Sequence, residues 1–306
     1  MHFLLPILLL PFASSNPIRF HPSHHQTSPI KCPLIFDGRI PLNTSLLDFD
    51  SAATSPYSPQ YVKGENLTWS SIIQFPPSYP PSRFDPPSNY KPFEVTISDR
   101  SLFRVSQGVQ TGFRRAGLLL KDDKNPAGAD AADKGVVTFH WSVSQDLARG
   151  MNLSHEYMNV WHERADYAGN QFSFLAGIVL KVDGGNGVDE KVEKESWKVV
   201  GRTNNVVFRT EILWRGWQNF AVVLDYDKST LQVFYSAGDD PLKAVTEPIA
   251  NDNTGGGQMQ LGMAKKPTET ETVVWDGYQE VLGNRMEGQR YGGVFVEDSS
   301  NGCISL

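Results

Sequence analysis

Short runs in which apolar and polar residues alternate recur along most of the chain from Cys32 onward. Period-two alternation is typical of β-strands with one buried face, and few stretches carry the 3.6-residue period of an amphipathic helix. The predicted strands span residues 92–98, 135–144, 155–163, 171–182, 196–202, 217–227, 231–237, 257–264, 273–280 and 292–298. So many strands with so few helices predict an all-β fold, a β-jelly roll or two-sheet antiparallel sandwich.

The clearest predicted hairpin runs from Phe220 to Tyr235, where Phe220, Val222 and Leu224 alternate on one face before the turn DKST. The span from Ser55 to Pro92 is rich in proline, which lacks the N–H donor that a central strand needs. We therefore expect this span to wrap the sandwich as an ordered loop. No repeat or second domain is evident, so residues 31–306 are predicted to form one domain.

The N-terminal region has a different composition. Residues 1–15, MHFLLPILLLPFASS, predict a secretory signal peptide, because the apolar run is shorter than the roughly 20 residues that span a bilayer. Residues 16–30 are rich in His, Pro and Ser without any period and predict a disordered leader. We expect a secreted, extracellular monomer that makes no contact with a membrane.

Secretion changes the interpretation of the cysteines and the sequons. In an oxidising compartment Cys32 and Cys303 are expected to pair, although two free thiols remain the alternative. The bridge would join the first and last strands, and the loop-entropy model gives about 4–5 kcal/mol as an upper figure. The triplets that begin at Asn43, Asn66 and Asn152 predict N-glycosylation sites.

The net charge of −6 argues against nucleic acid and against polyanionic sugars, both of which need a basic patch. The chain has no GxSxG elbow, no HExxH motif and no phosphate-binding glycine loop, so these other catalytic classes are disfavoured. Two alternatives stay open: a histidine tract at residues 21–25, and calcium bound by Asp225, Asp227 and residues 251–253. A neutral ligand fits the chain best.

Residues 155–163 concentrate acidic and aromatic side chains in one predicted strand. Strict alternation would place His155, Tyr157, Asn159, Trp161 and Glu163 on one face, and Glu156, Met158, Val160, His162 and Arg164 on the other. Hydrolysis of a glycosidic bond needs two carboxylates in one cleft, so Glu156 and Glu163 could act together only if a bulge intervenes. A plain solvated strand is the alternative interpretation.

Two other segments carry candidate binding residues. In residues 110–118, Arg114 and Arg115 lie beside small residues and could hold a carboxylate ionised or bind sugar hydroxyls, unless they are only solvated. In residues 273–280, Trp275 joins acidic and aromatic neighbours in an alternating pattern. That pattern puts adjacent side chains on opposite faces, so only part of the set can reach a cleft.

Several motifs resemble glycoside hydrolase family 131 in their order along the chain, from about residue 32 to residue 306. They are FDGRIP, YVKGENLTWS, QTGFRRA, NLSHEY, WHERADY, WQNFAVVLDYDKSTLQVFYS, DPLKAVTEP, NDNTGGGQ, VVWDGYQE and YGGVFVEDSSNGCISL. The resemblance implies a secreted fungal β-jelly roll that hydrolyses β-1,3, β-1,6 and β-1,4 linkages without a cofactor. The implied partner is a β-glucan polysaccharide or oligosaccharide.

The resemblance also implies two cleft glutamates, one in an RRAE motif and one between NLSHEY and WHERADY. Here the first motif reads RRAG, so Gly117 stands where the glutamate is expected. We therefore predict a β-glucanase, with a non-catalytic β-glucan-binding protein as the alternative and a lyase disfavoured by the acidic charge. The predicted catalytic residues are Glu163 and Glu156, and the predicted substrate-binding residues are His155, Tyr157, Trp161, Arg114 and Arg115, with Trp161 as the stacking platform.

Overall fold

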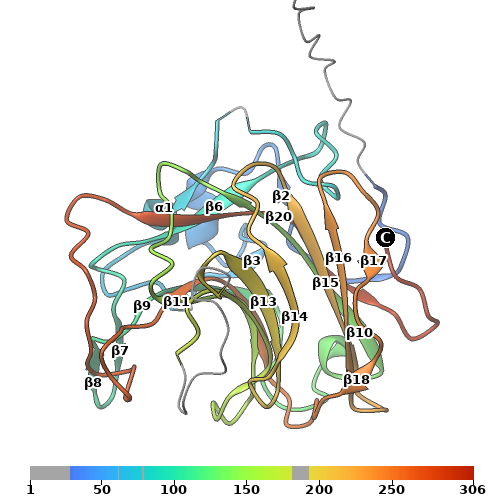
Figure 1. The fold of residues 1–306 in the computed structure, drawn as a ribbon. Helices are drawn as coiled ribbons and strands as arrows, with labels where there is room; N and C mark the ends of the chain where they lie inside the picture. The colour runs from blue at the N-terminus through green and yellow to red at the C-terminus, as the bar shows by residue number, and fades with distance from the viewer. Residues whose placement is uncertain (1–27, 61, 78, 181–192) are drawn as a thin grey trace, which may run out of the picture.

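The structure, a computed structural model, describes residues 28–306 apart from residues 61, 78 and 181–192. Two antiparallel sheets are stacked on each other (Figure 1). In sheet I the strand order is β17-β16-β15-β10-β20-β6-β4, with β1 pairing to β20 and β18 to β16. In sheet II the order is β14-β13-β12-β11-β19-β9-β3. The predicted all-β sandwich is confirmed.

The strands of sheet I come from the whole length of the chain. They are β1 (Leu34–Asp37), β4 (Ile73–Gln74), β6 (Phe93–Ile97), β10 (Val136–Gln145), β15 (Gln218–Asp225), β16 (Thr230–Ala237), β17 (Lys243–Ala244), β18 (Ile249–Ala250) and β20 (Glu287–Asp298). β15 and β16 form the hairpin expected from the alternation, with Val222 opposite Val233.

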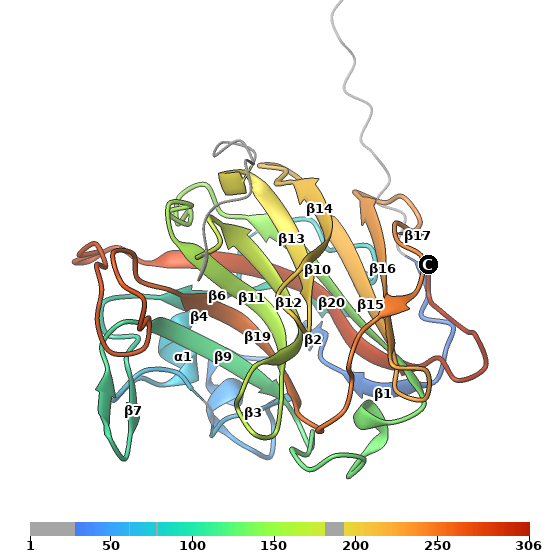
Figure 2. The same ribbon diagram turned by 60° about the horizontal axis from the view of Figure 1, so that its bottom comes forward.

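Sheet II is built mainly from the middle of the chain (Figure 2). Its strands are β3 (Tyr57–Ser58), β9 (Arg114–Leu120), β11 (Glu156–Glu163), β12 (Asn170–Gly177), β13 (Ser196–Gly201), β14 (Val206–Glu211) and β19 (Gln258–Lys265). Small pairs are formed by β2 (Ile40–Pro41) with β5 (Tyr90–Lys91), and by β7 (Phe103–Val105) with β8 (Gly108–Gln110); the helical turns are η1 (Leu46–Asp50), α1 (Trp69–Ile72) and η2 (Ala131–Asp133).

The hydrophobic core lies between the two sheets because both contribute apolar, largely aromatic, residues to it. Trp141 of sheet I stacks on Phe172 of sheet II at 6.0 Å, and Phe174 lies 4.5 Å from Phe220 between ring centroids. Such aromatic pairs add about 0.5–1.5 kcal/mol each beyond the burial of their area. The inward face of each sheet is therefore used for packing.

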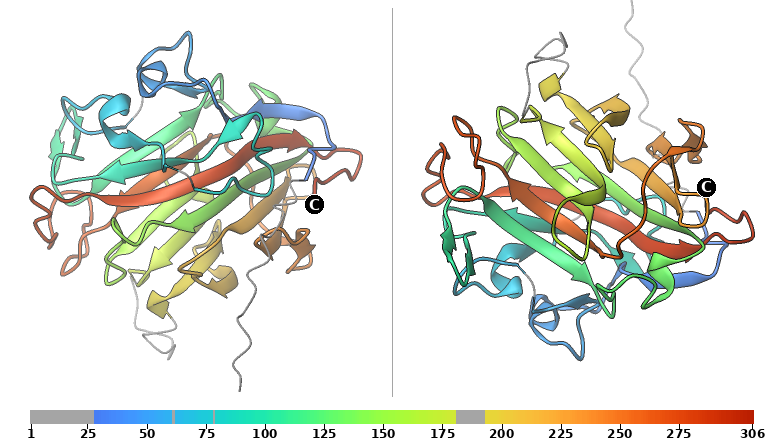
Figure 3. Two further views of the ribbon diagram at one scale, coloured as in Figure 1. Left: turned by 90° about the horizontal axis from the view of Figure 1, so that it is seen from above. Right: turned by 90° about the horizontal axis from the view of Figure 1, so that it is seen from below.

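The outer face of sheet I is covered as well. Ala221, Val223 and Phe295 on that face form a second apolar cluster with Phe84, which belongs to the proline-rich span. Trp217 Nε1 also donates a hydrogen bond to the carbonyl of Pro80 in the same span (2.9 Å). Residues 55–92 thus wrap the sandwich as predicted, although they also contribute the edge strands β3 and β4 and the short helix α1 (Figure 3).

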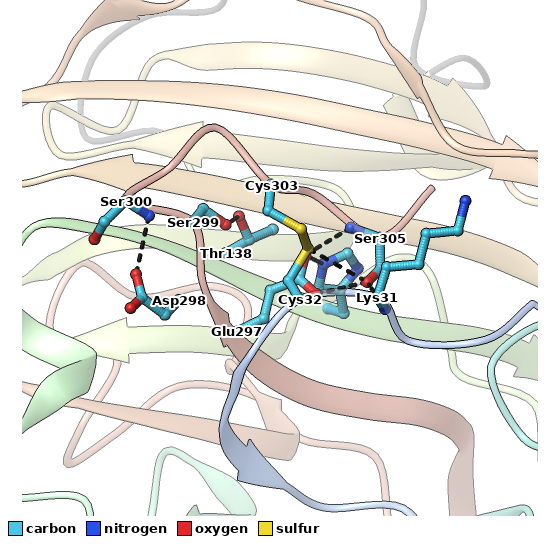
Figure 4. The surroundings of a disulfide bond; sticks show 10 residues. Lys31, Cys32, Thr138, Glu297, Asp298, Ser299, Ser300, Cys303 and Ser305 are labelled. Carbon is cyan, nitrogen blue, oxygen red and sulfur yellow. Dashed lines mark hydrogen bonds and ion pairs between the residues drawn. A yellow bond between two sulfur atoms is a disulfide. The ribbon is translucent and has the colours of Figure 1, made fainter.

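A disulfide between Cys32 and Cys303 fastens the two ends of the domain, with their Cα atoms 5.7 Å apart (Figure 4). β1 pairs with β20 next to this bridge, Leu34 lying opposite Glu297. Ser305 Oγ donates to Glu297 Oε2 (2.7 Å) beneath the bridge. The predicted pairing of the cysteines, and the joining of first and last strands, are confirmed.

Two predicted strands differ from the structure. The strand expected at 273–280 is part of the loop 266–286 between β19 and β20, where the described structure has one isolated bridge, from Thr268 to Tyr278. Gly277 has φ +102 there, which breaks the extended backbone. The strand expected at 171–182 ends at Gly177, whose φ is +77 and where a Cβ would lie 1.9 Å from the carbonyl oxygen of His155.

The predicted signal peptide (residues 1–15), the histidine tract and most of the predicted leader (residues 16–30) lie outside the described residues. In the part of the chain that the structure describes, no helix is long and apolar enough to cross a membrane. The same residues contain no group of three or more His, Cys, Asp or Glu side chains that could hold a metal ion. Asn253 Nδ2, from the suggested calcium ligands, instead donates to the carbonyls of Asp225 and Thr230.

Candidate active site

A β-bulge in β11 decides which of its side chains reach the outer face of sheet II. The register shifts between Met158 and Val160 in the pairings with both β12 and β19. Tyr157 and Val160 consequently both belong to the core, although strict alternation would separate them. The expectation that Glu156 and Glu163 lie on opposite faces is wrong, because an extra residue in a strand reverses the alternation beyond it.

The two glutamates nevertheless lie at opposite ends of β11. At a rise of about 3.3 Å per residue they are roughly 20 Å apart, whereas the carboxylates of glycosidases lie about 5–9.5 Å apart. Glu156 is 2% exposed, accepts a hydrogen bond from the backbone N–H of Leu180 (2.8 Å) and forms an ion pair with Lys266. These contacts give Glu156 a role in holding the fold together. The distance between Glu156 and Glu163 is too large for the two to act as a catalytic pair.

Glu163 is held by side chains from the two neighbouring strands. Gln260 Nε2 on β19 donates to Glu163 Oε2 (2.7 Å), and Arg115 Nη2 on β9 lies 3.6 Å from the same oxygen. The Glu163 side chain is 22% exposed, and within the described residues no group hydrogen-bonds its other oxygen, Oε1. Glu163 therefore presents a positioned carboxylate with one free oxygen at the surface of sheet II.

Trp161 forms the floor under this group. It is 1% exposed, and its Cζ2 and Cη2 atoms lie 3.0 Å from where a Cβ at Gly117 would be. The Arg115 guanidinium lies 6.0 Å from the centre of the Trp161 ring. Since Trp161 is buried, it offers no open face to a sugar ring, and this corrects the expectation of a stacking platform. Gly117 lies on β9, and a Cβ there would contact both Trp161 and Gln260.

The polar atoms around Glu163 are incompletely paired. Arg115 Nε, Gln260 Oε1 and Trp161 Nε1 are buried and make no hydrogen bond to any described residue. Native proteins pair most buried polar groups, so unpaired ones gathered at one place are unusual and typical of functional sites. Burial lowers the pKa of Arg115, and the negative charge of Glu163 opposes that effect. Glu163 is the carboxylate that compensates the charge of Arg115.

The structure does not bring the other predicted binding residues to Glu163. The Tyr157 hydroxyl lies in the core, donating to Glu287 Oε2 (3.0 Å) and accepting from the backbone N–H of Asn152 (2.9 Å). His155 is buried at the far end of β11, with Nδ1 2.8 Å from the carbonyl oxygen of Lys266. The expected placement of Tyr157 on the cleft face is thus wrong, because that side chain precedes the bulge and faces inward.

Arg114 faces away from its neighbour Arg115. It alternates with Arg115 along β9, and its Nη1 donates to the carbonyls of Thr111 (2.9 Å) and Phe113 (3.2 Å). Arg114 thereby holds the turn before the strand in place.

The three sequon asparagines, Asn43, Asn66 and Asn152, are all exposed, as glycosylation requires, and their modification stays a prediction.

A cavity of about 450 Å³ lies elsewhere, between β1 and the β2–β5 pair. It is lined by Arg39, Asp37 and Tyr90 among others. The Arg39 guanidinium binds both carboxylate oxygens of Asp37 and packs 4.1 Å over the Tyr90 ring. These groups satisfy one another, so the cavity adds nothing to the chemistry at Glu163.

Residues 34–302 match the family model described as the glycoside hydrolase 131 catalytic N-terminal domain. The chain belongs to glycoside hydrolase family 131. No curated protein matches this family 131 chain in a sequence search.

Two solved structures share the fold of this family 131 protein. The catalytic domain of a GH131 β-glucanase from Podospora anserina superposes with a TM-score of 0.65 at 19% identity, covering 89% of this chain and 97% of that one. The catalytic domain of a family 131 protein from Coprinopsis cinerea gives 0.62 at 17% identity, covering 87% and 94%. At such low identity the likeness establishes the fold.

The sequence interpretation missed Gln260. Its strand reads GQMQLGMA, in which Gln258 and Gln260 alternate with Met259 and Leu261, so an amide-bearing outer face was visible in the sequence. What the pattern could not supply is the sheet order, which places β19 between β11 and β9. That order brings Gln260 against both Glu163 and position 117 of this family 131 protein.

Asp123, which accepts a hydrogen bond from the N–H of Met259 on β19, makes the stability of the protein depend on pH. Burial, helped by the nearby charges of Asp130 and Asp133, raises the pKa of Asp123 to about 8, while the hydrogen bond from Met259 N–H opposes the rise. Because the folded pKa is above the ordinary value of 3.8, the folded state binds the proton more tightly. The resulting stability is complete below about pH 4 and is lost as the pH rises through about 8.

We expect Asp123→Asn to remove this part of the pH dependence, because the amide carries no proton to lose. Urea unfolding of both proteins at pH 4.5, 6 and 8 measures the difference in unfolding free energy at each pH. The Asn variant should gain stability relative to the unsubstituted protein as the pH increases. A difference that stays constant across this range would show that Asp123 does not titrate there.

Proposed function

We propose that this protein hydrolyses β-glucan on the outer face of sheet II, with Glu163 as its catalytic carboxylate. The observation that carries the proposal is the fixed and partly exposed Glu163 carboxylate, held at Oε2 by Gln260 and Arg115 with Oε1 free. The family supplies the class of reaction, and the resemblance supplies β-1,3, β-1,6 and β-1,4 linkages as the substrates to test. The signal peptide expected at residues 1–15 supports secretion as the setting.

The chemistry open to Glu163 is proton transfer or nucleophilic attack at the anomeric carbon. Arg115 Nη2 and Gln260 Nε2 both contact Oε2, so they hold the carboxylate in one orientation. A free Oε1 can then approach the sugar or a water molecule. With glycine at position 117 the second carboxylate of the motif is absent, so we expect slow turnover.

The second candidate function is β-glucan binding without hydrolysis. Gly117 favours it, since glycosidases of either stereochemistry use two carboxylates on either side of the scissile bond. Glu163 also has a role that needs no chemistry. Burial lowers the pKa of Arg115, and the charge of Glu163, alone among the described carboxylates, opposes that effect. In this candidate Glu163 and Arg115 bind sugar hydroxyls instead of moving protons.

One pair of measurements separates the two candidates. The purified protein is incubated with laminarin, pustulan and barley glucan, while reducing ends and the bound fraction are both recorded. Hydrolysis of at least one glucan is expected, at a low rate. Binding without any release of reducing ends would establish the second candidate, and neither binding nor release would refute both.

A further inference from the structure

We propose that Trp275 and Tyr278 form a second sugar-binding surface, which holds glucosyl rings of the glucan chain away from Glu163. The inference rests on the proposed function, because it assigns the same polysaccharide as ligand. It concerns the loop 266–286 between β19 and β20. Figure 1 shows part of this loop, in orange-red, beside the β7–β8 hairpin at the lower left, from where it continues to β20.

Both aromatic side chains are unusually exposed. Trp275 is 43% exposed and Tyr278 52%, on a loop of an otherwise well-packed domain whose other large aromatic residues are mostly buried. Isolated exposed aromatics are common, but here two lie three residues apart on one loop. Flat rings with an apolar face and a polar tip are suited to the C–H faces of sugars.

The backbone under these side chains is held in place by neighbouring segments. The N–H of Gly112 donates to the carbonyl of Val274 (3.0 Å), and Gln279 Nε2 donates to the carbonyl of Gly112 (2.8 Å). Thr111 Oγ1 donates to the carbonyl of Trp275, and Thr268 and Tyr278 exchange both of their backbone hydrogen bonds. The loop therefore presents the two rings from a fixed backbone, which lowers the entropy cost of binding.

His155 supports the Tyr278 ring from below. The two rings stack with centroids 6.4 Å apart and planes inclined by 24°. His155 is itself fixed, with Nε2 2.7 Å from Glu280 Oε2, and Lys265 binds the other oxygen of Glu280 (2.6 Å). We thus assign His155 as a positioning residue for Tyr278, a role that differs from the direct sugar contact expected from the sequence.

The β7–β8 hairpin contacts both the Glu163 site and Trp275. The Arg115 guanidinium lies 5.9 Å from the ring centre of Phe103 on β7. Trp275 Cζ3 lies 3.9 Å from the position of a Cβ at Gly108 on β8. A chain bound at Glu163 and Arg115 can therefore continue over the hairpin to the aromatic pair, which a single sugar unit cannot do.

Acidic side chains outnumber basic ones on this loop (Glu269, Glu271, Asp276 and Glu280 against Lys266 and Arg285), which disfavours an anionic polymer and favours a neutral one as the ligand. Asp276 accepts hydrogen bonds from Thr270 and Thr272. Burial raises the pKa of Glu280, but hydrogen bonds from Lys265 and Asn152 and the charge of Lys265 outweigh it and lower the pKa to about 2. Of the two cations of this loop, Lys266 pairs with Glu156, and Arg285 is exposed and forms no ion pair with another described residue. A second copy of the protein is the other conceivable occupant of an aromatic patch, and the experiment distinguishes the two.

The test compares ligands of different length in a Glu163→Gln background, where hydrolysis does not consume the ligand. Affinity for laminarin and for laminaribiose is measured by titration calorimetry for Trp275→Ala, Tyr278→Ala and the double variant. We expect laminarin binding to weaken about tenfold in each single variant, with laminaribiose binding almost unchanged. His155→Ala should weaken laminarin binding as Tyr278→Ala does, and Trp275→Phe should restore most of the affinity.

Matched controls lie on the same molecule. Val281→Ala removes the most exposed apolar residue of the loop (80%). Trp214→Ala removes a tryptophan from another loop that is about as exposed (41%) as Trp275 (43%). Both should bind laminarin normally, and the variants at the exposed positions Trp275, Tyr278, Val281 and Trp214 should unfold near the temperature of the parent. Normal laminarin binding by the double variant would overturn the inference, as would dimerisation of the parent that Trp275→Ala abolishes. Failure of the parent to bind any glucan would refute the proposed function itself, and this inference with it.

Discussion

Replacing Glu163 by glutamine is expected to lower the rate of β-glucan hydrolysis by about 10²- to 10⁴-fold, the usual contribution of a general acid or base. The amide has the size of the carboxylate and can still accept the hydrogen bond from Gln260. It cannot transfer a proton or attack an anomeric carbon, and it no longer pairs with Arg115. The loss should therefore appear in kcat, measured from reducing ends under saturating glucan.

Glu156→Gln is the matched control, since it makes the same chemical change at the other end of β11. We expect it to keep the hydrolysis rate and to lower the unfolding temperature, because Lys266 would lose its partner and the 2% exposed side chain would keep only the backbone bond to Leu180. Equal hydrolysis by Glu163→Gln and the unsubstituted protein would exclude Glu163. A rate loss confined to Glu156→Gln would move the catalytic centre to the opposite end of the strand.

The fold could be predicted because it follows from local patterns. Alternation along Phe220–Leu224 and Leu231–Tyr235 identifies a hairpin whose inward residues do form the core. The pairing of Cys32 and Cys303 follows from their number and the expected compartment. The prediction of a strand at 273–280 is wrong because alternation also arises by chance in loops. There the positive φ of Gly277 and the hydrogen bonds from Thr270 and Thr272 to Asp276 determine the backbone conformation.

The site was harder to predict because it depends on relations between strands. Nothing in the letters EYMNVWHE shows that a bulge lies between Met158 and Val160, yet that bulge places Glu156 and Glu163 on one face and turns Tyr157 inward. Sheet order is equally invisible in the sequence. It places Gln260 between Glu163 and position 117, and it lets Arg115 reach across β19 to β11.

Position 117 has the geometry to return a second carboxylate to the site. An ideal Cβ there would lie 2.7 Å from Gln260 Oε1, and Gln260 is the residue that holds Glu163. Gly117 lies within β9 and has no positive φ, so its backbone conformation suits any residue, but the Gln260 side chain must shift to make room for a Cβ. A side chain at this position therefore projects against Gln260, the residue that binds Glu163, and the resemblance to the motif RRAE implies a glutamate here.

We expect Gly117→Glu to raise hydrolysis by about 10²-fold or more, because one carboxylate can then act as acid while the other acts as base or nucleophile. Two neighbouring carboxylates also separate their pKa values, so a bell-shaped pH profile of kcat/KM should appear. The new Cβ would lie 3.0 Å from Trp161, which is packed, so the unfolding free energy should fall by about 1–3 kcal/mol.

Gly117→Gln separates the chemistry from the crowding, because it brings the same atoms against Gln260 and Trp161 without a carboxylate. It should lose the same stability and gain no hydrolysis. If the Glu and Gln variants hydrolyse glucan equally, the second carboxylate does not act from position 117, and Glu163 works with a different partner. If the Glu variant alone gains activity, the glycine at position 117 is what limits this protein, and the rest of the site has kept the arrangement that two-carboxylate hydrolysis requires.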